Sequence, residues 1–197
     1  MAKLSTFVRH KDVVDLPNEE RILMAKKLII VCGFSFAGKS TLADAICSKL
    51  KYVQVDVDVT KVELFGPSIG DEDISGEEWN RIYRETDLKI EECLKNSVGV
   101  IDASRNFRKQ ERDNARHIAQ QLGAGMIVVH VDTPESVVRQ RWEENRITRT
   151  RRVISDKEFQ DTISAMEPPM DEENPIVFHH DEDSKQWIAQ LAEYLCR

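Results

Sequence analysis

The sequence predicts an α/β fold in which a parallel sheet of five strands is covered by helices on both faces. Short apolar runs alternate with longer segments of helical periodicity along most of the 197 residues, and this alternation is typical of parallel sheets. A glycine-rich segment lies between the first apolar run and the first helical segment, where such sheets commonly bind ligands. At this length, and with 41% hydrophobic residues, we expect one domain.

The first half of the chain supplies two strands and two helices. The apolar run KLIIVC predicts a buried strand, and the pattern after it has the period of a helix. Ser75 and Glu78 have the spacing of a capping box, which predicts a helix start. The expected elements are a strand at 27–32, a helix at 40–50, a strand at 52–55, a loop at 65–70 and a helix at 76–94.

The second half continues the alternation. Gly123 is placed to end one helix, Pro134 comes early in the next, and Pro168 and Pro169 follow a third. The expected elements are strands at 98–102, 126–131 and 176–179, and helices at 107–122, 134–145, 156–166 and 184–196. We therefore expect residues 27–197 to form the domain. The polar and poorly periodic residues 1–26 are expected to be an N-terminal appendage.

Composition limits the possible functions. The 28 Lys and Arg residues against 35 Asp and Glu residues give a net charge of -7, which argues against general electrostatic binding to nucleic acid but leaves a local basic site open. The chain has no apolar run long enough for a membrane span, and its start lacks a signal-peptide pattern. We expect a soluble, cytoplasmic protein. Its four widely spaced cysteines are expected to be reduced thiols in the core.

The glycine-rich segment has the sequence of a P-loop. Residues 33–40 read Gly-Phe-Ser-Phe-Ala-Gly-Lys-Ser and match G-x-x-x-x-G-K-[ST], between a predicted strand and a predicted helix. With the alternating pattern, this motif predicts a three-layer P-loop NTPase fold. Backbone amides at the helix start would hold phosphate, Lys39 would neutralise its charge, and Ser40 would ligate Mg²⁺. The expected nucleotide ligands are Gly33, Ser35, Gly38, Lys39, Ser40 and Thr41. A glycine-rich turn that matches by chance is the alternative.

Three acidic residues are candidates for chemistry beside this loop. Asp56 and Asp58 follow the second predicted strand, and we expect them to share one side of it. A carboxylate there can accept a proton from a substrate hydroxyl, although exposed acids at a strand end would give the same pattern. Asp102 ends the run VGVI, so it occupies a Walker-B-like position that suits a metal ligand or a strand-end cap.

An arginine-rich segment at about 139–155 predicts a lid. A mobile arginine-rich segment would stabilise the negative charge that develops during phosphoryl transfer. Two alternatives stay open: a solvated helix face paired with Glu143 and Glu144, and a site for a polyanion such as RNA. The arginines are Arg139, Arg141, Arg146, Arg149, Arg151 and Arg152. Trp79 and His130 are interpreted as core residues rather than ligands.

Five segments together resemble the P-loop kinase-like proteins related to zeta toxins, chloramphenicol phosphotransferase and polynucleotide 5′-hydroxyl kinases. They read GFSFAGKSTLA, VDVTKVELFG, GVIDASRNFRKQERDNARHIAQQLGA, VVHVDTPESVVRQRW and ISAMEPPMDEENP. The resemblance implies a fold similar to nucleoside monophosphate kinases, with Asp58 as general base, Asp102 as the acid of a DATN-like segment, and Arg141 and Arg146 as lid arginines. This chain differs by having Lys61 where an arginine is usual, and by a one-residue shift at 104–106.

These observations predict an ATP-dependent phosphotransferase that uses Mg²⁺. The γ-phosphate would move to a hydroxyl of a small molecule or of a nucleic-acid 5′ end, with Asp58, Lys39, Arg141 and Arg146 as the catalytic residues. The net charge of -7 favours a small acceptor. The alternative function is an NTP-dependent switch or binding module with slow hydrolysis, and a toxin acting on a nucleotide sugar is a narrower variant of the kinase. No membrane partner is expected, and the sequence does not give an oligomeric state.

Overall fold

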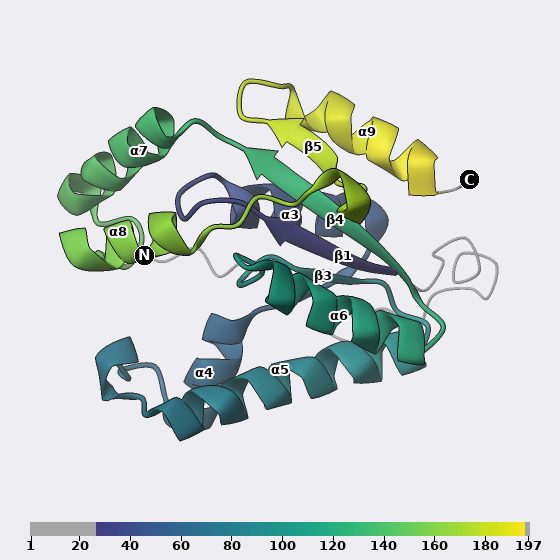
Figure 1. Ribbon diagram of the computed structural model, residues 1–197, viewed down its shortest axis with the longest axis horizontal. Coiled ribbons are helices and arrows are strands. Elements are labelled where there is room, and N and C mark those ends of the chain that lie inside the picture. Colours follow the sequence, from purple (N-terminus) through teal and green to yellow (C-terminus); the bar gives the residue numbers. More distant parts are fainter. Residues whose placement is uncertain (1–26, 196–197) are drawn as a thin grey trace.

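The computed structural model describes residues 27–195, and its centre is a five-stranded parallel sheet. The strand order is β2-β3-β1-β4-β5, and every neighbouring pair is parallel. The strands are β1 (Lys27–Cys32), β2 (Val53–Val55), β3 (Val100–Asp102), β4 (Gly125–Asp132) and β5 (Ile176–His179). Helices cover both faces of the sheet (Figure 1). The predicted α/β class and the five parallel strands are confirmed.

The helices follow the predicted order with one addition, α4. They are α3 (Lys39–Leu50), α4 (Val57–Phe65), α5 (Gly76–Lys95), α6 (Lys109–Gln121), α7 (Glu135–Thr148), α8 (Asp156–Ala165) and α9 (Ser184–Leu195), with short 3-10 helices η1 (Asp71–Asp73) and η2 (Asp171–Glu173). α7 and α8 stand beyond the carboxyl ends of the strands in Figure 1. The predicted appendage at 1–26 lies outside the described residues.

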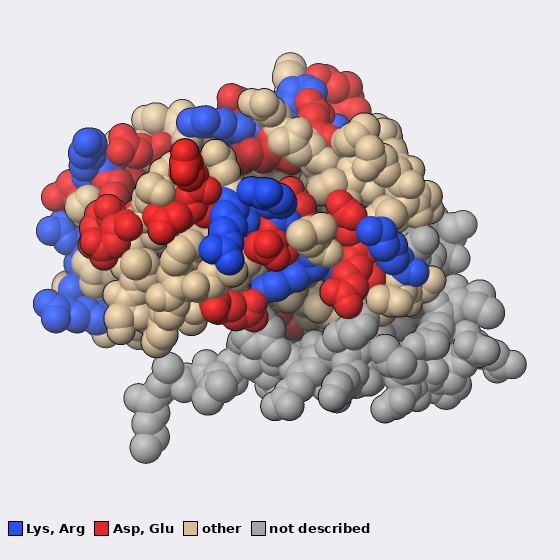
Figure 2. Space-filling view, turned by 90° about the horizontal axis from the view of Figure 1, so that it is seen from below, with Lys and Arg blue, Asp and Glu red and all other residues tan. Residues whose placement is uncertain are grey.

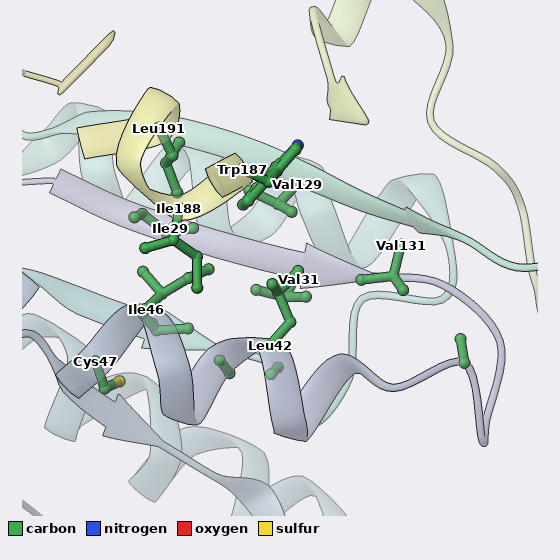
Figure 3. Close-up of a cluster of buried hydrophobic side chains, with 14 of the residues drawn as sticks. Ile29, Val31, Leu42, Ile46, Cys47, Val129, Val131, Trp187, Ile188 and Leu191 are labelled. Atoms are coloured by element: carbon green, nitrogen blue, oxygen red, sulfur yellow. The ribbon is translucent and has the colours of Figure 1, made fainter. Parts of the chain in front are cut away.

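The central strand β1 is buried on both faces. Ile29 and Val31 point to one face and pack in the cluster that includes residues of α3 and α9, part of which Figure 3 shows. Leu28 and Ile30 alternate with them and pack against α5 and α6 on the other face. All four side chains are fully buried. This alternation explains why the strand reads as a continuous apolar run.

The start of α5 is set by its capping box. The Ser75 side chain accepts a hydrogen bond from the backbone N–H of Glu78, and the Glu78 side chain accepts one from the backbone N–H of Ser75 at 2.8 Å. These two bonds satisfy amides that have no partner inside the helix. The predicted capping box is confirmed, and α8 begins with the same arrangement at Ser155 and Glu158.

The prediction that Asp56 and Asp58 share one side of a strand is wrong. β2 ends at Val55, and Asp56 is the N-cap of α4, where its Oδ1 accepts a hydrogen bond from the backbone N–H of Asp58 at 2.7 Å. Asp58 lies in the first turn of this helix. The segment VDVTKVELF is rich in β-branched residues and lacks a clear helical stripe, so the cap and the packing against α5 decide its conformation.

Cys32, Cys47 and Cys93 are buried and free, as predicted for reduced core thiols. Cys196 lies outside the described residues. Among residues 27–195, no helix has the length and apolar character needed to cross a membrane.

Candidate functional site

The P-loop connects β1 to α3 at the carboxyl edge of the sheet. Gly33 has φ 142° and Gly38 has φ 109°, conformations that side chains disfavour. A Cβ added to Gly33 would lie 2.7 Å from the carbonyl oxygen of Val131 on β4. Glycine at this position therefore lets the loop pass close to the neighbouring strand.

The amino end of α3 has the properties of a phosphate cradle. Its N-cap, Gly38, makes no side-chain cap bond, and the first turn contains no acidic residue. The first amides of a helix have no partner within it, and the helix dipole adds positive potential there. The N–H groups of the first turn, including those of Ser40 and Thr41, therefore suit a phosphate group.

Lys39 is folded over the loop. Its Nζ donates hydrogen bonds to the carbonyl oxygens of Gly33 at 3.0 Å and Phe34 at 2.9 Å, and it lies 4.8 Å from the ring centroid of Phe107. Burial lowers the pKa of Lys39 to about 8, and the positive charge of Arg151 acts in the same direction. The ammonium group is thus held among loop carbonyls beside the cradle.

A pocket of about 430 Å³ adjoins the loop on the side of α3 and α7. Arg141 on α7 reaches the loop and donates from Nη1 to the carbonyl oxygens of Phe36 at 3.2 Å and Ala37 at 2.8 Å. The wall includes Gly38, Thr41, Arg141, Arg151, Phe178 and His180. Apolar, aromatic and cationic groups therefore meet beside the phosphate cradle, in a pocket whose size suits a nucleotide.

The lid arginines divide into two groups. Arg141 and Arg151 line the nucleotide-sized pocket. Arg146 instead pairs with Asp156 at 3.1 Å and lies 5.0 Å from the ring centroid of Trp142, with its side chain half exposed. The structure does not bring Arg146 to the P-loop, and its catalytic role stays a prediction. Arg151 is a pocket residue that its place in a run of six arginines did not single out.

Asp58 lies on the other side of the loop, at the start of α4. Its side chain is 77% exposed, and its Oδ1 is 3.6 Å from Nζ of the buried Lys61. Lys61 also pairs with Asp71 at 2.6 Å. Asp56 differs from Asp58 because it is largely buried as a helix cap, and burial raises the pKa of Asp56 to about 6. Asp58 is therefore the carboxylate that a substrate can reach.

Asp102 at the end of β3 is fully buried and heavily bonded. Its Oδ1 accepts hydrogen bonds from the backbone N–H of Ser104 at 3.2 Å and from its hydroxyl at 3.0 Å. Its Oδ2 pairs with Nε of Arg105 at 3.1 Å. The Ser104 hydroxyl also accepts a bond from the N–H of Val57, at 3.0 Å. Asp102 thus joins the ends of β2 and β3, and little of its bonding capacity remains for a metal ion.

A buried ion pair that the sequence analysis missed anchors the segment after α8. Arg112 on α6 and Glu173 in η2 form two bonds, Nε to Oε2 at 2.7 Å and Nη2 to Oε1 at 2.9 Å. Nη1 of Arg112 also donates to the carbonyl oxygen of Glu167 at 2.9 Å. The sequence does not predict this buried pair, because its two residues are 61 positions apart in a chain with many charged residues.

Comparison with known proteins identifies the family. Residues 28–169 match the AAA domain. The chain belongs to this family. A comparison of this chain with curated proteins gives no match.

Solved structures share the fold of this AAA domain. Chaetomium thermophilum Kti12 in complex with ADP-AlF3 is 17% identical with a TM-score of 0.66, and the alignment covers 85% of this chain and 98% of that one. A gluconokinase from Sinorhizobium meliloti 1021 is 21% identical with a TM-score of 0.58, over 86% of this chain and 95% of that one. A chain of the Pnkp1/Rnl/Hen1 RNA repair complex is 23% identical with a TM-score of 0.60, over 71% of this chain and 43% of that one.

The family and these neighbours confirm the resemblance to P-loop kinase-like proteins. At these identities the solved structures show the fold that this AAA domain shares with them.

Proposed function

We propose that this chain is an ATP-dependent phosphotransferase that moves the γ-phosphate of ATP to a hydroxyl group of a second substrate. The observation that carries the proposal is the position of the phosphate cradle. A pocket with two arginines lies on one side of it, and an exposed carboxylate, Asp58, stands at the start of α4 on the other side. Transfer between two substrates requires a donor site and an acceptor site that meet at the phosphate.

The donor nucleotide would bind in the pocket beside α3. The glycines at 33 and 38 and the amides of the first turn of α3 would hold the phosphates, with Ser35 in the same loop. Ser40 is the residue we propose as a direct ligand of Mg²⁺, which would neutralise phosphate charge when bound. Asp102 would act through a metal-bound water, because its oxygens already accept bonds from Ser104 and Arg105.

In the transfer step, Asp58 would accept the proton of the acceptor hydroxyl as its oxygen bonds to the γ-phosphorus. The bond from that phosphorus to the bridging oxygen breaks, and ADP leaves. Lys39 and Arg141, which both reach the P-loop, would stabilise the charge on the transferring oxygens. Arg151 lines the same pocket and is a further candidate, while Arg146 remains a predicted lid arginine.

The test is transfer of labelled γ-phosphate from ATP to a panel of sugars, nucleosides, antibiotics and 5′-hydroxyl oligonucleotides. We expect label on one acceptor class, and we expect Lys39→Ala and Asp58→Asn to abolish it. Asp73→Asn is the matched control, because Asp73 is an exposed acid in η1 and asparagine keeps an oxygen that can accept the hydrogen bond from the backbone N–H of Gly70. Label released only as free phosphate, at a rate that Asp58→Asn does not change, would instead favour an NTP-dependent switch.

A further inference from the structure

A second pocket lies on the side of the P-loop where α4 carries Asp58, which we call the acceptor side. It has a volume of about 270 Å³ and is formed by α5, the residues after β3 and the start of α6. Polar side chains dominate its wall, and we call it the α5–α6 pocket. Its lining residues are Asn80, Tyr83, Asp87, Arg105, Glu111, Asn114 and Ala115.

The α5–α6 pocket is connected to the candidate general base. The Ser104 hydroxyl, next to Arg105, donates to Asp102 and accepts a hydrogen bond at 3.0 Å from the N–H of Val57, the residue before Asp58. The loop that forms part of the pocket wall therefore contacts the start of α4. Arg105 is bonded to Asp102 at the end of β3, the strand next to β1 and the P-loop. An acceptor in this pocket would approach the phosphate from the side opposite the donor pocket.

Arg105 is built into the wall of this pocket with its charge neutralised. Its side chain is 15% exposed, and it pairs with Asp102 through Nε and with Asp87 through Nη2. Its guanidinium carbon lies 5.8 Å from the ring centroid of Tyr83. Arginine has five N–H donors, and the described residues supply no hydrogen bond to Nη1. The pocket therefore has a hydrogen-bond donor whose charge is outweighed by two carboxylates.

A surplus of carboxylates also surrounds two other cations on this side of the molecule. Lys61 pairs with Asp58 and Asp71, and Arg152 pairs with Asp71, Glu72 and Glu158. With Arg105 and its two acids, three cations are matched by six carboxylates. Arg81 and Arg84 on the outer surface of α5 lie with Glu77 and Glu78 around a separate hollow. Figure 2 shows the face below α5, where basic and acidic side chains are interspersed.

We propose that the α5–α6 pocket binds the phosphoryl acceptor and that this acceptor is a small polyhydroxylated molecule without negative charge. This inference rests on the proposed phosphotransferase function. Arg105, Asn80, Asn114 and the Tyr83 hydroxyl offer donors and acceptors to hydroxyl groups. An anionic acceptor would meet the surplus of carboxylates and be repelled. The 5′ end of a nucleic acid, with its phosphodiester backbone, is disfavoured for the same reason.

The test compares matched ligands by binding, without requiring transfer. Ligand-observed NMR would measure a panel of methyl glycosides and the corresponding uronic acids, plus a 5′-hydroxyl trinucleotide, against the full chain with ADP and Mg²⁺. Each glycoside differs from its uronic acid by a carboxylate in place of a hydroxymethyl group. We expect at least one glycoside to bind, and its uronic acid to bind about tenfold more weakly, as one net repulsive charge contact in a partly exposed site implies. Equal or tighter binding of the uronic acids or the trinucleotide, or no binding by any glycoside, would overturn the proposal.

A charge variant tests the cause of the discrimination. Asp87→Asn removes one carboxylate from the pocket wall and keeps an oxygen that can accept from Arg105. We expect it to reduce the glycoside preference severalfold. Asp113→Asn is the matched control: this acid on α6 pairs with Lys109 and Arg116 outside the pocket and should leave the preference unchanged. An unaltered preference in Asp87→Asn would refute the electrostatic explanation.

The failures of the two proposals are distinguishable. If glycosides bind with the expected preference but no acceptor is labelled by ATP, the phosphotransferase function fails and the charge selectivity of the pocket stands. If ATP labels an anionic acceptor more efficiently than any uncharged one, the phosphotransferase function stands and the inference about the acceptor fails.

Discussion

Replacement of Glu173 by glutamine should destabilise the fold strongly. Glu173 and Arg112 are fully buried, with side-chain exposures of 1% and 0%, and they share two hydrogen bonds of 2.7 and 2.9 Å. Glutamine keeps the shape and one acceptor but leaves the Arg112 charge buried without a carboxylate. Breaking a buried pair by neutralising one partner costs about 3–5 kcal/mol. Since small domains are stable by only about 5–15 kcal/mol, this is a large fraction of the total.

Urea denaturation at pH 7, analysed by linear extrapolation, measures this loss. The matched control is Glu91→Gln, which removes the exposed pair with Lys95 on α5 and should cost no more than about 0.5 kcal/mol. A loss below about 1 kcal/mol for Glu173→Gln would refute the reasoning, because it would mean that Arg112 does not depend on this carboxylate.

Three further predictions concern charge at the site. Burial raises the pKa of Asp56 to about 6, so the folded state binds a proton more tightly than the unfolded state, and this contribution to stability is lost as pH rises from about 4 to about 7. The stability of Asp56→Asn should therefore rise relative to that of the native chain over that interval, by up to about 3 kcal/mol. If urea denaturation gives the same difference in unfolding free energy between variant and native chain at pH 4 and at pH 7, this prediction is contradicted. Because the pKa of Lys39 is lowered to about 8, the affinity for ATP should fall between pH 7 and pH 9, and Lys39→Arg should remove that pH dependence. If calorimetric titration shows a constant affinity in the native chain over this range, Lys39 does not have this role. Arg151→Ala should weaken ATP binding about tenfold, consistent with loss of one charge-assisted contact, whereas Arg139→Ala should not, since Arg139 pairs with Glu135 away from the pocket; equal losses in both variants would be the contrary result.

The sequence was sufficient for the fold class because its signals were local. The alternation of apolar residues in β1, the capping box at Ser75 and Glu78, and the P-loop between strand and helix each depend on residues close in the chain. The burial of both faces of β1 made its strand unambiguous. These local patterns agree with the tertiary structure, which is why they could be predicted.

The acceptor side could not be predicted to the same extent because it depends on distant contacts. α4 has no clear apolar stripe, and its conformation is fixed by the Asp56 cap and by packing against α5. The pairing of Arg152 with Asp71 joins residues 81 positions apart. The role of Arg105, in the loop after β3, depends on Asp87 on α5. A charge-rich sequence offers many such pairs, and only the fold selects among them.

The most direct test of the proposed function is the acceptor-dependent rate of ADP formation by Asp58→Asn, measured together with its ATP affinity. We expect the rate to fall at least about 100-fold, as loss of a general base implies, while the dissociation constant for ATP stays within about threefold of the native value because Asp58 lies outside the donor pocket. ATP hydrolysis that needs no acceptor and proceeds unchanged in Asp58→Asn would contradict a phosphotransferase and favour a nucleotide-controlled switch.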